Sequence, residues 1–384
     1  MFEKSMKKIF ITAVILLLIT MFLFGIYNVF NKKSEITQKQ NLVEEKPKEE
    51  VKNLKQENGK ISLVSDVPVL GPLINRNSGK LRYYSREDGT VWESDLQGDN
   101  KVKVENFKLS GLKGVSWSSN ERDSISEFSG EGGHYFYVFN HISGTGTRLR
   151  QGVDYAVWDD TGSKIVYKFF DASTKKRSIA ISKVDGADSL TLAEIPYFKV
   201  SLQQIPHTSI VSYWNYPSAN EEGILSTVSI LGGESKNLFS GRFGSDYLWS
   251  PDGNSAVVSS LDQKGGKNIS LGIFKMRDTS YEDIGIPTLA QKAIWSRDNK
   301  TLYYALPLFP GDASVLPDDY QSGKITTTDT FWKVDIYTGR KERIIDPNQI
   351  TEKYDASLLM LSPSEDAVFF VNRVDGKLYR ISLR

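Results

Sequence analysis

Paired carboxylates are the residues of this sequence with the most obvious chemical potential. Asp159-Asp160 and Asp318-Asp319 could serve glycoside hydrolysis or hold a cation, since both tasks need two acidic groups close together. Adjacent residues of a strand point to opposite faces, however, and Asp159-Asp160-Thr161-Gly162 has the position of a turn between two strands. The first pair is therefore interpreted as a structural turn. No run matches the calcium-binding loop pattern.

The three histidines are dispersed along the chain. His134 and His141 bracket the strand-like run YFYVFN, and their odd separation places them on opposite faces of a strand. His207 lies in a separate repeat. The chain has no cysteine, which excludes disulfides, Cys-ligated zinc, iron–sulfur clusters and thiol nucleophiles. We therefore expect no metal site, no cofactor and no catalytic constellation, and the sequence predicts a protein that is not an enzyme.

Two further motifs have structural interpretations. The glycine-rich run Ser129–His134 joins two strand-like runs rather than opening a helix, so it does not fit a phosphate-binding loop. Lys175-Lys176-Arg177 is interpreted as a solvated loop tip, with an acidic partner or lipid headgroups as the alternative. Lys and Arg number 48 against 47 Asp and Glu, and a net charge of +1 gives no general attraction for nucleic acid. No nucleic-acid partner is expected.

An uncharged apolar segment lies near the start of the sequence. Residues 9–30 read IFITAVILLLITMFLFGIYNVF, which as a helix would extend for about 33 Å, close to the hydrocarbon thickness of a bilayer. The run is longer than the apolar region of a signal peptide and no A-x-A-like site follows it. An uncleaved transmembrane signal-anchor helix is therefore preferred to a cleaved signal peptide.

The flanks of this helix set the expected topology. Residues 1–8 contain Lys4, Lys7 and Lys8, and a short basic tail of this kind usually stays in the cytoplasm. Residues 31–58 are rich in Lys, Glu, Gln and Asn and are interpreted as a charged flexible linker, because they hold too little apolar surface to fold. Residues 59–384 then lie outside the cytoplasmic membrane, in a single-pass, N-in/C-out arrangement.

A short motif recurs through residues 59–384. Its clearest copy, YLWSPDGNSAVVSSL, joins a strand ending in Trp249, a Ser-Pro-Asp-Gly turn and a second strand. Pro fixes φ at such a turn, Asp accepts a bond from a following N–H, and Gly tolerates positive φ. Related copies surround Trp117, Trp158, Trp295 and Leu361, with weaker ones at Ile74 and Leu202. Seven units at a period of about 45 residues predict an all-β fold, a seven-bladed β-propeller preceded by one N-terminal transmembrane helix.

The two ends of this repeat region complement each other. The last unit stops after its third strand, at LYRISLR, whereas KISLVSD (residues 60–66) has strand character but no unit of its own. We expect this early run to complete the last blade, which would close the ring and leave no long free edge.

The repeated WSPDG turn, followed by a β-branched strand, resembles the TolB-like propeller repeat, a WD-like repeat. The resemblance covers about residues 60–384, with one full motif and several degenerate ones. This repeat occurs in periplasmic TolB, whose partners are envelope proteins, and in propeller domains of prolyl-oligopeptidase-type peptidases. It implies a propeller fold and an envelope protein or peptide as partner. No G-x-S-x-G nucleophile elbow follows the blades, so the resemblance does not imply peptidase activity.

These features lead to a functional hypothesis and an alternative. The chain is expected to be a membrane-anchored extracytoplasmic β-propeller that acts as a protein-binding or scaffolding module of the cell envelope. The alternative is a propeller enzyme, or a glycan- or peptide-sensing domain, with a site in the central funnel. An enzyme of the glycosidase kind would place two or more acids about 5–9 Å apart in the channel, and a sensor would have an aromatic-lined pocket.

The partner-binding surface is expected on an insertion in the sixth unit, between TLYYAL and TFWKVDIY. Comparable connections are short polar loops, so a long connection with apolar residues indicates a function. Tyr320 is the expected aromatic anchor, with Asp318 and Asp319 on a polar rim. The alternative is an internal lid that packs on the propeller and recognises nothing. The full set of expected contact residues is Phe309, Val315, Leu316, Asp318, Asp319 and Tyr320.

Overall fold

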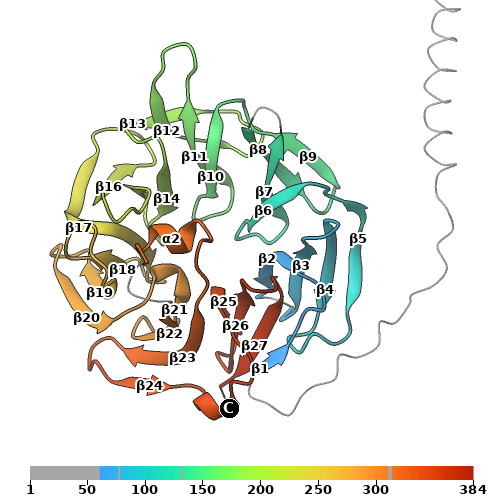
Figure 1. Cartoon of the computed structure of the whole chain (residues 1–384). Helices are drawn as coiled ribbons and strands as arrows, with labels where there is room; N and C mark the ends of the chain where they lie inside the picture. Colours follow the sequence, from blue (N-terminus) through green and yellow to red (C-terminus); the bar gives the residue numbers. More distant parts are fainter. Residues whose placement is uncertain (1–60, 77, 131–132, 310–313, 384) are drawn as a thin grey trace, which may run out of the picture. The chain divides into compact units, whose positions relative to one another are not determined.

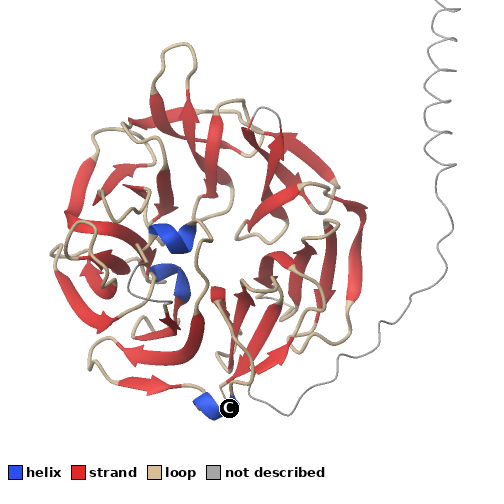
Figure 2. Cartoon of the chain, viewed as in Figure 1, coloured by secondary structure: helices blue, strands red, loops and turns tan. Residues whose placement is uncertain are grey.

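The computed structural model describes residues 61–383 except 77, 131–132 and 310–313, and it shows an all-β fold. The sheets lie side by side around a central axis, as the blades of a β-propeller do (Figure 1). Figure 2 shows how little of the described chain is helical. The expected tail, transmembrane helix and linker (residues 1–58) lie outside the described residues. In the part of the chain that is described, no helix is long and apolar enough to cross a membrane.

The first three sheets along the chain each consist of four consecutive antiparallel strands. In each sheet the first strand lies nearest the axis and the last lies at the perimeter (Figure 1). The strands are β2 (Val69–Ile74), β3 (Leu81–Ser85), β4 (Thr90–Ser94) and β5 (Val102–Lys108); β6 (Leu112–Trp117), β7 (Asp123–Gly130), β8 (Gly133–Asn140) and β9 (Thr145–Arg148); and β10 (Val153–Trp158), β11 (Lys164–Phe170), β12 (Arg177–Lys183) and β13 (Leu190–Glu194).

A long strand joins the next strands into one seven-stranded sheet. The first half of β17 pairs with β16 and its second half pairs with β18, with Phe243 at the changeover. The second half of β17 ends in Tyr247, Leu248 and Trp249, with which the clearest copy of the sequence motif begins. The strands of this sheet are β14 (Val200–Gln204), β15 (Ile210–Asn215), β16 (Glu222–Ser229), β17 (Lys236–Trp249), β18 (Ser255–Leu261), β19 (Ser270–Lys275) and β20 (Tyr281–Ile286).

Two four-stranded sheets complete the ring. A one-turn helix, α2 (Asp318–Gln321), lies in the connection between β22 and β23, and short 3₁₀ turns cover Ala290–Lys292 and Pro347–Gln349. The strands are β21 (Ala293–Trp295), β22 (Thr301–Leu308), β23 (Thr328–Asp335) and β24 (Lys341–Arg343); and β25 (Ala356–Leu361), β26 (Ala367–Asn372), β27 (Leu378–Ser382) and β1 (Ile61–Leu63).

The ring is closed by its first strand. β1 pairs antiparallel with β27, with Ile61 opposite Ile381 and Leu63 opposite Tyr379. The contact continues past the strand, because the Ser65 hydroxyl oxygen accepts a hydrogen bond from the Leu378 N–H at 2.8 Å. The expectation that the run before the first unit completes the last sheet is confirmed.

The tryptophans of the motif connect neighbouring sheets. The Trp158 indole N–H donates to the Ser116 carbonyl at 2.8 Å, and the Trp295 indole N–H donates to the Leu248 carbonyl at 3.1 Å. In each case the acceptor lies on the inner strand of the preceding sheet. These side chains therefore lie between neighbouring sheets, as predicted, and each also donates a hydrogen bond across the junction. Apolar clusters fill the same junctions, as where Ile181 of β12 packs with Tyr213 of β15.

The motif turns also contact one another around one face of the ring. The Asp252 side chain accepts from the Asn254 N–H inside its own turn, and the Asp252 N–H donates to Asn299 of the next turn at 3.0 Å. Gly253 has φ +71°, and a Cβ there would lie 2.4 Å from the Pro206 carbonyl oxygen, so glycine is required. Asp160 likewise accepts from the His207 N–H of the following turn. The turn interpretation of Asp159-Asp160 is confirmed.

Loss of the closing strand should destabilise the propeller. A chain that begins at residue 68 lacks β1 and Ser65, which removes three cross-strand pairs worth about 0.2–1 kcal/mol each and several backbone hydrogen bonds. Thermal unfolding should then begin at least about 5 °C below that of a chain starting at residue 59. Equal melting temperatures for the two chains would disprove the stabilising role of β1.

Candidate functional site

The insertion between β22 and β23 lies where the sequence placed it, and it reaches a distant sheet. The Asp318 carboxylate accepts a hydrogen bond from the Ser218 hydroxyl at 2.9 Å and another from the Ala219 N–H at 2.7 Å. A Cβ on Gly244 would lie 2.8 Å from the Pro317 ring, so the segment also packs on β17. Figure 1 shows α2 near the centre of the ring. The insertion therefore spans from its own sheet to the connection between β15 and β16.

The residues predicted to bind a partner differ in their exposure. Leu316 and Tyr320 are only 3% and 1% exposed, and Phe309 packs against the same buried cluster. Val315 is 38% exposed, while Asp319 is largely buried and accepts from the Val315 N–H and from Lys324. Packing of this kind matches the internal lid that was the alternative. A partner-binding role for the loop stays a prediction, and it has to use the exposed side chains.

The buried ring of Tyr320 belongs to a polar network beneath the insertion. Its hydroxyl donates to Asp355 at 2.7 Å, and the Arg373 guanidinium lies 3.9 Å from its ring centroid. The Lys292 ammonium lies 2.6 Å from Asp329 and 2.8 Å from Asp355, and all three side chains are fully buried. Burial opposes ionisation of Asp355, yet the Lys292 charge and hydrogen bonds lower its pKa. Residues 316–320 therefore belong to the folded core.

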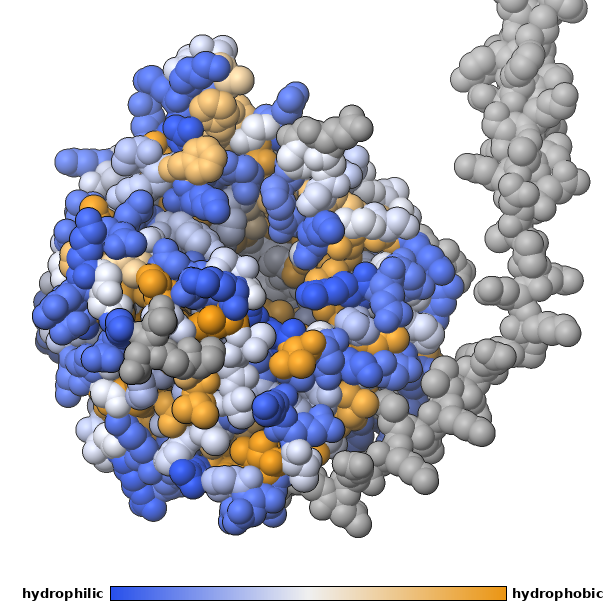
Figure 3. Space-filling model, viewed as in Figure 1, coloured by the Kyte–Doolittle hydropathy of each residue, from blue (hydrophilic) through white to orange (hydrophobic). Residues whose placement is uncertain are grey.

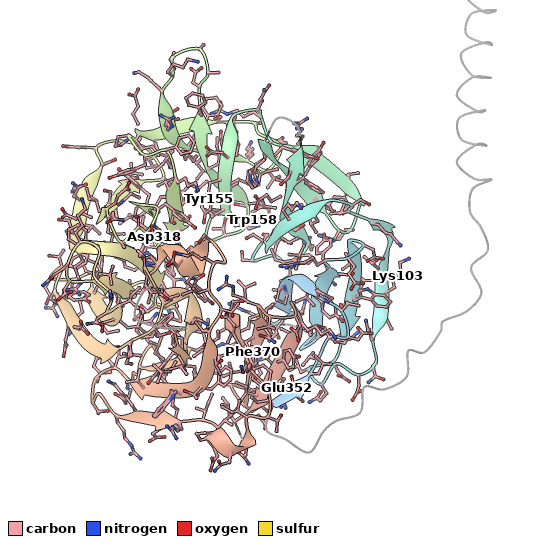
Figure 4. All side chains as sticks on the ribbon, viewed as in Figure 1. Lys103, Tyr155, Trp158, Asp318, Glu352 and Phe370 are labelled. Carbon is pink, nitrogen blue, oxygen red and sulfur yellow. The ribbon has the colours of Figure 1, made fainter. Side chains whose placement is uncertain are left out.

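Irregular inner strands direct two other side chains. The pairing of β10 with β11 shifts register between Val153 and Tyr155, and that of β17 with β18 shifts between Phe243 and Asp246. Such bulges bend a strand and re-aim the side chain that follows. Figure 4 shows Tyr155 and Asp318 at the inner ends of their elements, around the central opening. Figure 3 shows this face of the molecule hollowed near its centre.

Asp246 is a carboxyl group of raised pKa on this face. Its Oδ1 accepts a hydrogen bond from the buried Trp214 indole at 3.1 Å. Burial raises the Asp246 pKa from the ordinary 3.8 to about 6, although the bonds from Trp214 and a backbone N–H act in the opposite direction. A carboxyl group with this pKa can both donate and accept a proton near neutral pH.

Two tyrosines lie within electrostatic reach of Asp246. The protein around Tyr155, together with the charges of Asp246 and Glu127, raises the pKa of its hydroxyl to about 12. Burial raises the pKa of Tyr216, and so do the charges of Asp246 and Asp318. Both hydroxyls therefore stay protonated and can donate hydrogen bonds beside the Asp246 carboxyl group.

An aromatic-lined cavity of about 380 Å³ opens beside Tyr216. Three aromatic side chains, a lysine and a glutamate line it, and they come from the β13–β14 and β15–β16 connections. An aromatic-lined pocket is the feature expected of a glycan- or peptide-sensing domain. The lining residues are Pro196, Tyr197, Phe198, Lys199, Asn215, Tyr216, Ser218 and Glu221. Ser218 and Tyr216 link this pocket to Asp318 and Asp246.

Sequence reasoning missed this group of residues. Tyr155 and Asp246 each stand three residues before the tryptophan that ends an inner strand, Trp158 and Trp249. Aligning the repeats on these tryptophans would have shown two polar residues at one structural position. Nothing in the sequence marks the change in the Asp246 pKa, because that change depends on burial in the folded chain.

The other face of the ring has cavities of about 550 and 510 Å³ around the motif turns. Asp160 and His207 lie there, but both are used in contacts between turns. His134 contacts Glu127, while His141 contacts Tyr84 and Ser124. Among residues 61–383 that are described, no group of three or more His, Asp or Glu side chains is arranged to hold a metal ion.

No family model matches the sequence, and no curated protein sequence matches it. Solved structures do match the fold. Two structures of oligogalacturonate lyase superpose with TM-scores of 0.62 (the enzyme from Vibrio parahaemolyticus, 10% identity) and 0.60 (a complex with manganese, 11% identity), each match covering 84% of this chain and 93% of the other. The β-propeller domain of the trilobed protease from Pyrococcus furiosus gives 0.54 at 10% identity, covering 83% and 97%. TolB from Acinetobacter baumannii gives 0.46 at 11% identity, covering 72% and 62%.

The chain has a β-propeller fold. Likeness at these identities concerns the fold alone, but it corrects one expectation. The prediction that this protein is not an enzyme is contradicted, because the two lyase structures, which match over most of both chains, are those of an enzyme. In the described part of the chain, no three His, Asp or Glu side chains are grouped as a manganese site of the kind seen in one of those structures would require.

Asp246 should make stability depend on pH. The folded state holds the Asp246 proton up to about pH 6, whereas the unfolded state releases it near 3.8. The unfolding free energy therefore falls as pH rises through this range, by roughly 3 kcal/mol for this group. Asp246→Asn lacks that proton, so the variant should be more stable than the wild type at pH 8 and similar to it at pH 4. Urea unfolding at both pH values measures this, and an equal difference at both would refute the altered acidity.

Proposed function

We propose that this protein is a carbohydrate-active propeller, which binds a saccharide in the aromatic-lined pocket and transfers a proton through Asp246. The observation that carries the proposal is a carboxyl group of pKa about 6, Asp246, within electrostatic reach of Tyr216, which lines that pocket. The alternative read from the sequence, a funnel site for catalysis or glycan sensing, thus has more support than a protein-binding scaffold. The pairing of a raised carboxyl pKa with a ligand-sized cavity is typical of functional sites.

The shape and lining of the pocket favour a sugar. Aromatic side chains offer flat apolar faces to sugar rings, while Asn, Ser and Glu side chains at the rim suit hydroxyl groups. A cavity of about 380 Å³ accommodates one or two sugar units. Oligogalacturonate, the oligosaccharide in the name of the matching lyase, supports this ligand class as a starting point for tests.

Each residue then has a role in acid–base chemistry. Protonated Asp246 can give its proton to the glycosidic oxygen as the bond between that oxygen and the sugar carbon breaks. A water molecule then forms the new bond to that carbon and returns a proton to the Asp246 carboxylate. Trp214 donates to Oδ1 and so orients the carboxyl group. Tyr216 is positioned to hold the sugar next to it. Asp318 is fixed by Ser218 and Ala219 and keeps the insertion beside the pocket.

Two variants separate catalysis from binding. Against a panel of neutral and acidic oligosaccharides, Asp246→Asn should lower turnover at least about 100-fold and leave affinity unchanged, because only the proton is lost. Tyr216→Ala should weaken affinity about ten-fold through loss of ring contact. Calorimetry and product analysis measure these effects, with Asp278→Asn in a distant turn as the control. Failure of every oligosaccharide to bind, or full turnover by Asp246→Asn, would contradict the proposal.

We also propose that the whole chain is a seven-bladed propeller on a membrane anchor. The seven-stranded sheet is then two blades that share β17, because β17 pairs with β16 and β18 along different halves. The uncharged run of residues 9–30 supports the anchor, with residues 1–8 in the cytoplasm and residues 31–58 as the linker. The saccharide site would face the extracytoplasmic side, where envelope glycans are available.

Protease treatment of intact spheroplasts tests this topology. Trypsin should remove the propeller and leave a small N-terminal fragment in the membrane, because the propeller is expected outside. A cytoplasmic protein followed in the same samples controls for lysis. Cleavage that requires permeabilisation would place the propeller on the cytoplasmic side and refute the proposed orientation.

A further inference from the structure

Phe198, at the outer end of the aromatic pocket, is exposed to solvent and surrounded by cations. Phe198 is 71% exposed. The Arg177 guanidinium lies 5.3 Å from its ring centroid and the Lys168 ammonium 5.6 Å from it. Lys199, which follows it in the chain, stacks over Tyr216 at 5.3 Å. An apolar ring held in solvent between positive charges is a ready platform for a ligand that has both a flat face and a negative charge.

The cations of this platform differ in their partners. Lys168 is neutralised by Asp154 at 2.6 Å, and Lys176 is paired with Glu194 at 2.8 Å. Among the described residues, Arg177 and Lys199 form no ion pair with a carboxylate. Arg177 lies over the rings of Phe170 and Phe198, and Lys199 lies over the ring of Tyr216. A guanidinium stacked on a ring keeps its N–H edge free for carboxylate or phosphate oxygens.

The charges of the site are therefore separated along its length. Asp246 and Asp318 lie within electrostatic reach of Tyr216, and Glu221 lines the pocket with it, so acidic groups gather at the Tyr216 end. Arg177 and Phe198 lie at the outer end, close to the connection between β11 and β12 that extends beyond the rim in Figure 1. A ligand that fits this order presents uncharged hydroxyl groups inside and an anionic group outside.

We propose that Phe198, Arg177 and Lys199 form a second subsite, which binds a sugar unit that has a carboxylate or phosphate group. The inference rests on the proposed carbohydrate function and adds to it the charge and the minimum length of the ligand. One unit occupies the pocket beside Tyr216, and the next stacks on Phe198 with its anionic group between Arg177 and Lys199. The ligand is thus an acidic oligosaccharide of at least two units.

Single-stranded nucleic acid also combines flat rings with negative charge, but it fits this site less well. Every unit of a nucleic acid has a phosphate, so one phosphate would lie beside the acidic inner end. A continuous basic groove is the usual solution for such chains. Here the cations without carboxylate partners are confined to the outer subsite, which matches a local anionic group better than a charged backbone.

The test compares matched probes on the wild type and two variants. A galacturonate tetrasaccharide provides carboxylates, its methyl ester is the neutral form, and a phosphorylated oligosaccharide provides phosphate. By calorimetry at low salt, the wild type should bind at least one anionic probe about ten-fold more tightly than the methyl ester. Arg177→Gln should remove most of that preference and leave affinity for the methyl ester unchanged, because Arg177 does not line the pocket. Lys199→Gln should also remove most of that preference. Preference for one anionic probe over the other identifies the group that is recognised.

Arg148→Gln is the control, because Arg148 also stacks on an aromatic ring, at 4.9 Å from Tyr135, but that ring does not line the pocket, whereas Phe198 does. It should behave as the wild type does. Equal affinity for the methyl ester and the anionic probes would overturn the subsite while sparing the carbohydrate function. Tighter binding of a dT tetranucleotide would overturn the subsite in favour of nucleic acid. Failure of all saccharides would overturn both proposals.

Discussion

Closure of the ring is the constraint on which the rest of this structure depends. Each sheet has two faces, and both are buried only when a neighbour is present on each side. The pairing of β1 with β27 supplies the last edge, and the indoles of Trp158 and Trp295 tie inner strands to the sheets before them. The central opening keeps its shape because no sheet can move without disturbing both junctions. A site that takes residues from several sheets needs that rigidity.

The candidate site is formed at a cost to this framework. Bulges interrupt the regular pairing of β10 and β17, and they bring Tyr155 and Asp246 towards the centre. Burial of an ionised Asp246 is unfavourable, which is why its pKa rises. The insertion with α2 adds buried contacts on the same face, including the Lys292 network. These contacts stabilise the fold and offset the free-energy cost of burying Asp246. Selection for stability alone would not retain such a buried acidic group.

The sequence predicts the repeats well and the site poorly, for physical reasons. Turn chemistry is local, so Ser250-Pro251-Asp252-Gly253 and its relatives mark the strand boundaries without any knowledge of the fold. The closing role of residues 60–66 follows from counting strands. The pKa of Asp246 is raised by its burial in the folded chain, against the effect of the Trp214 hydrogen bond, and the exposure of Phe198 depends on the packing of the folded chain. Tyr320 illustrates the same limit, because an aromatic residue in a long loop has the same pattern whether it faces a partner or Asp355.

The unbroken course of β17 gives one sector of the ring a distinct mechanical character. Elsewhere neighbouring sheets meet through side chains, and such junctions can tilt slightly without breaking backbone hydrogen bonds. From β14 to β20 the backbone hydrogen bonding is continuous through β17, so this sector should unfold as one unit. Tyr216 and Asp246 both belong to this seven-stranded unit, whereas Tyr155 and α2 belong to its neighbours. Small movements between sheets would therefore change the width of the site but not the distance between Tyr216 and Asp246.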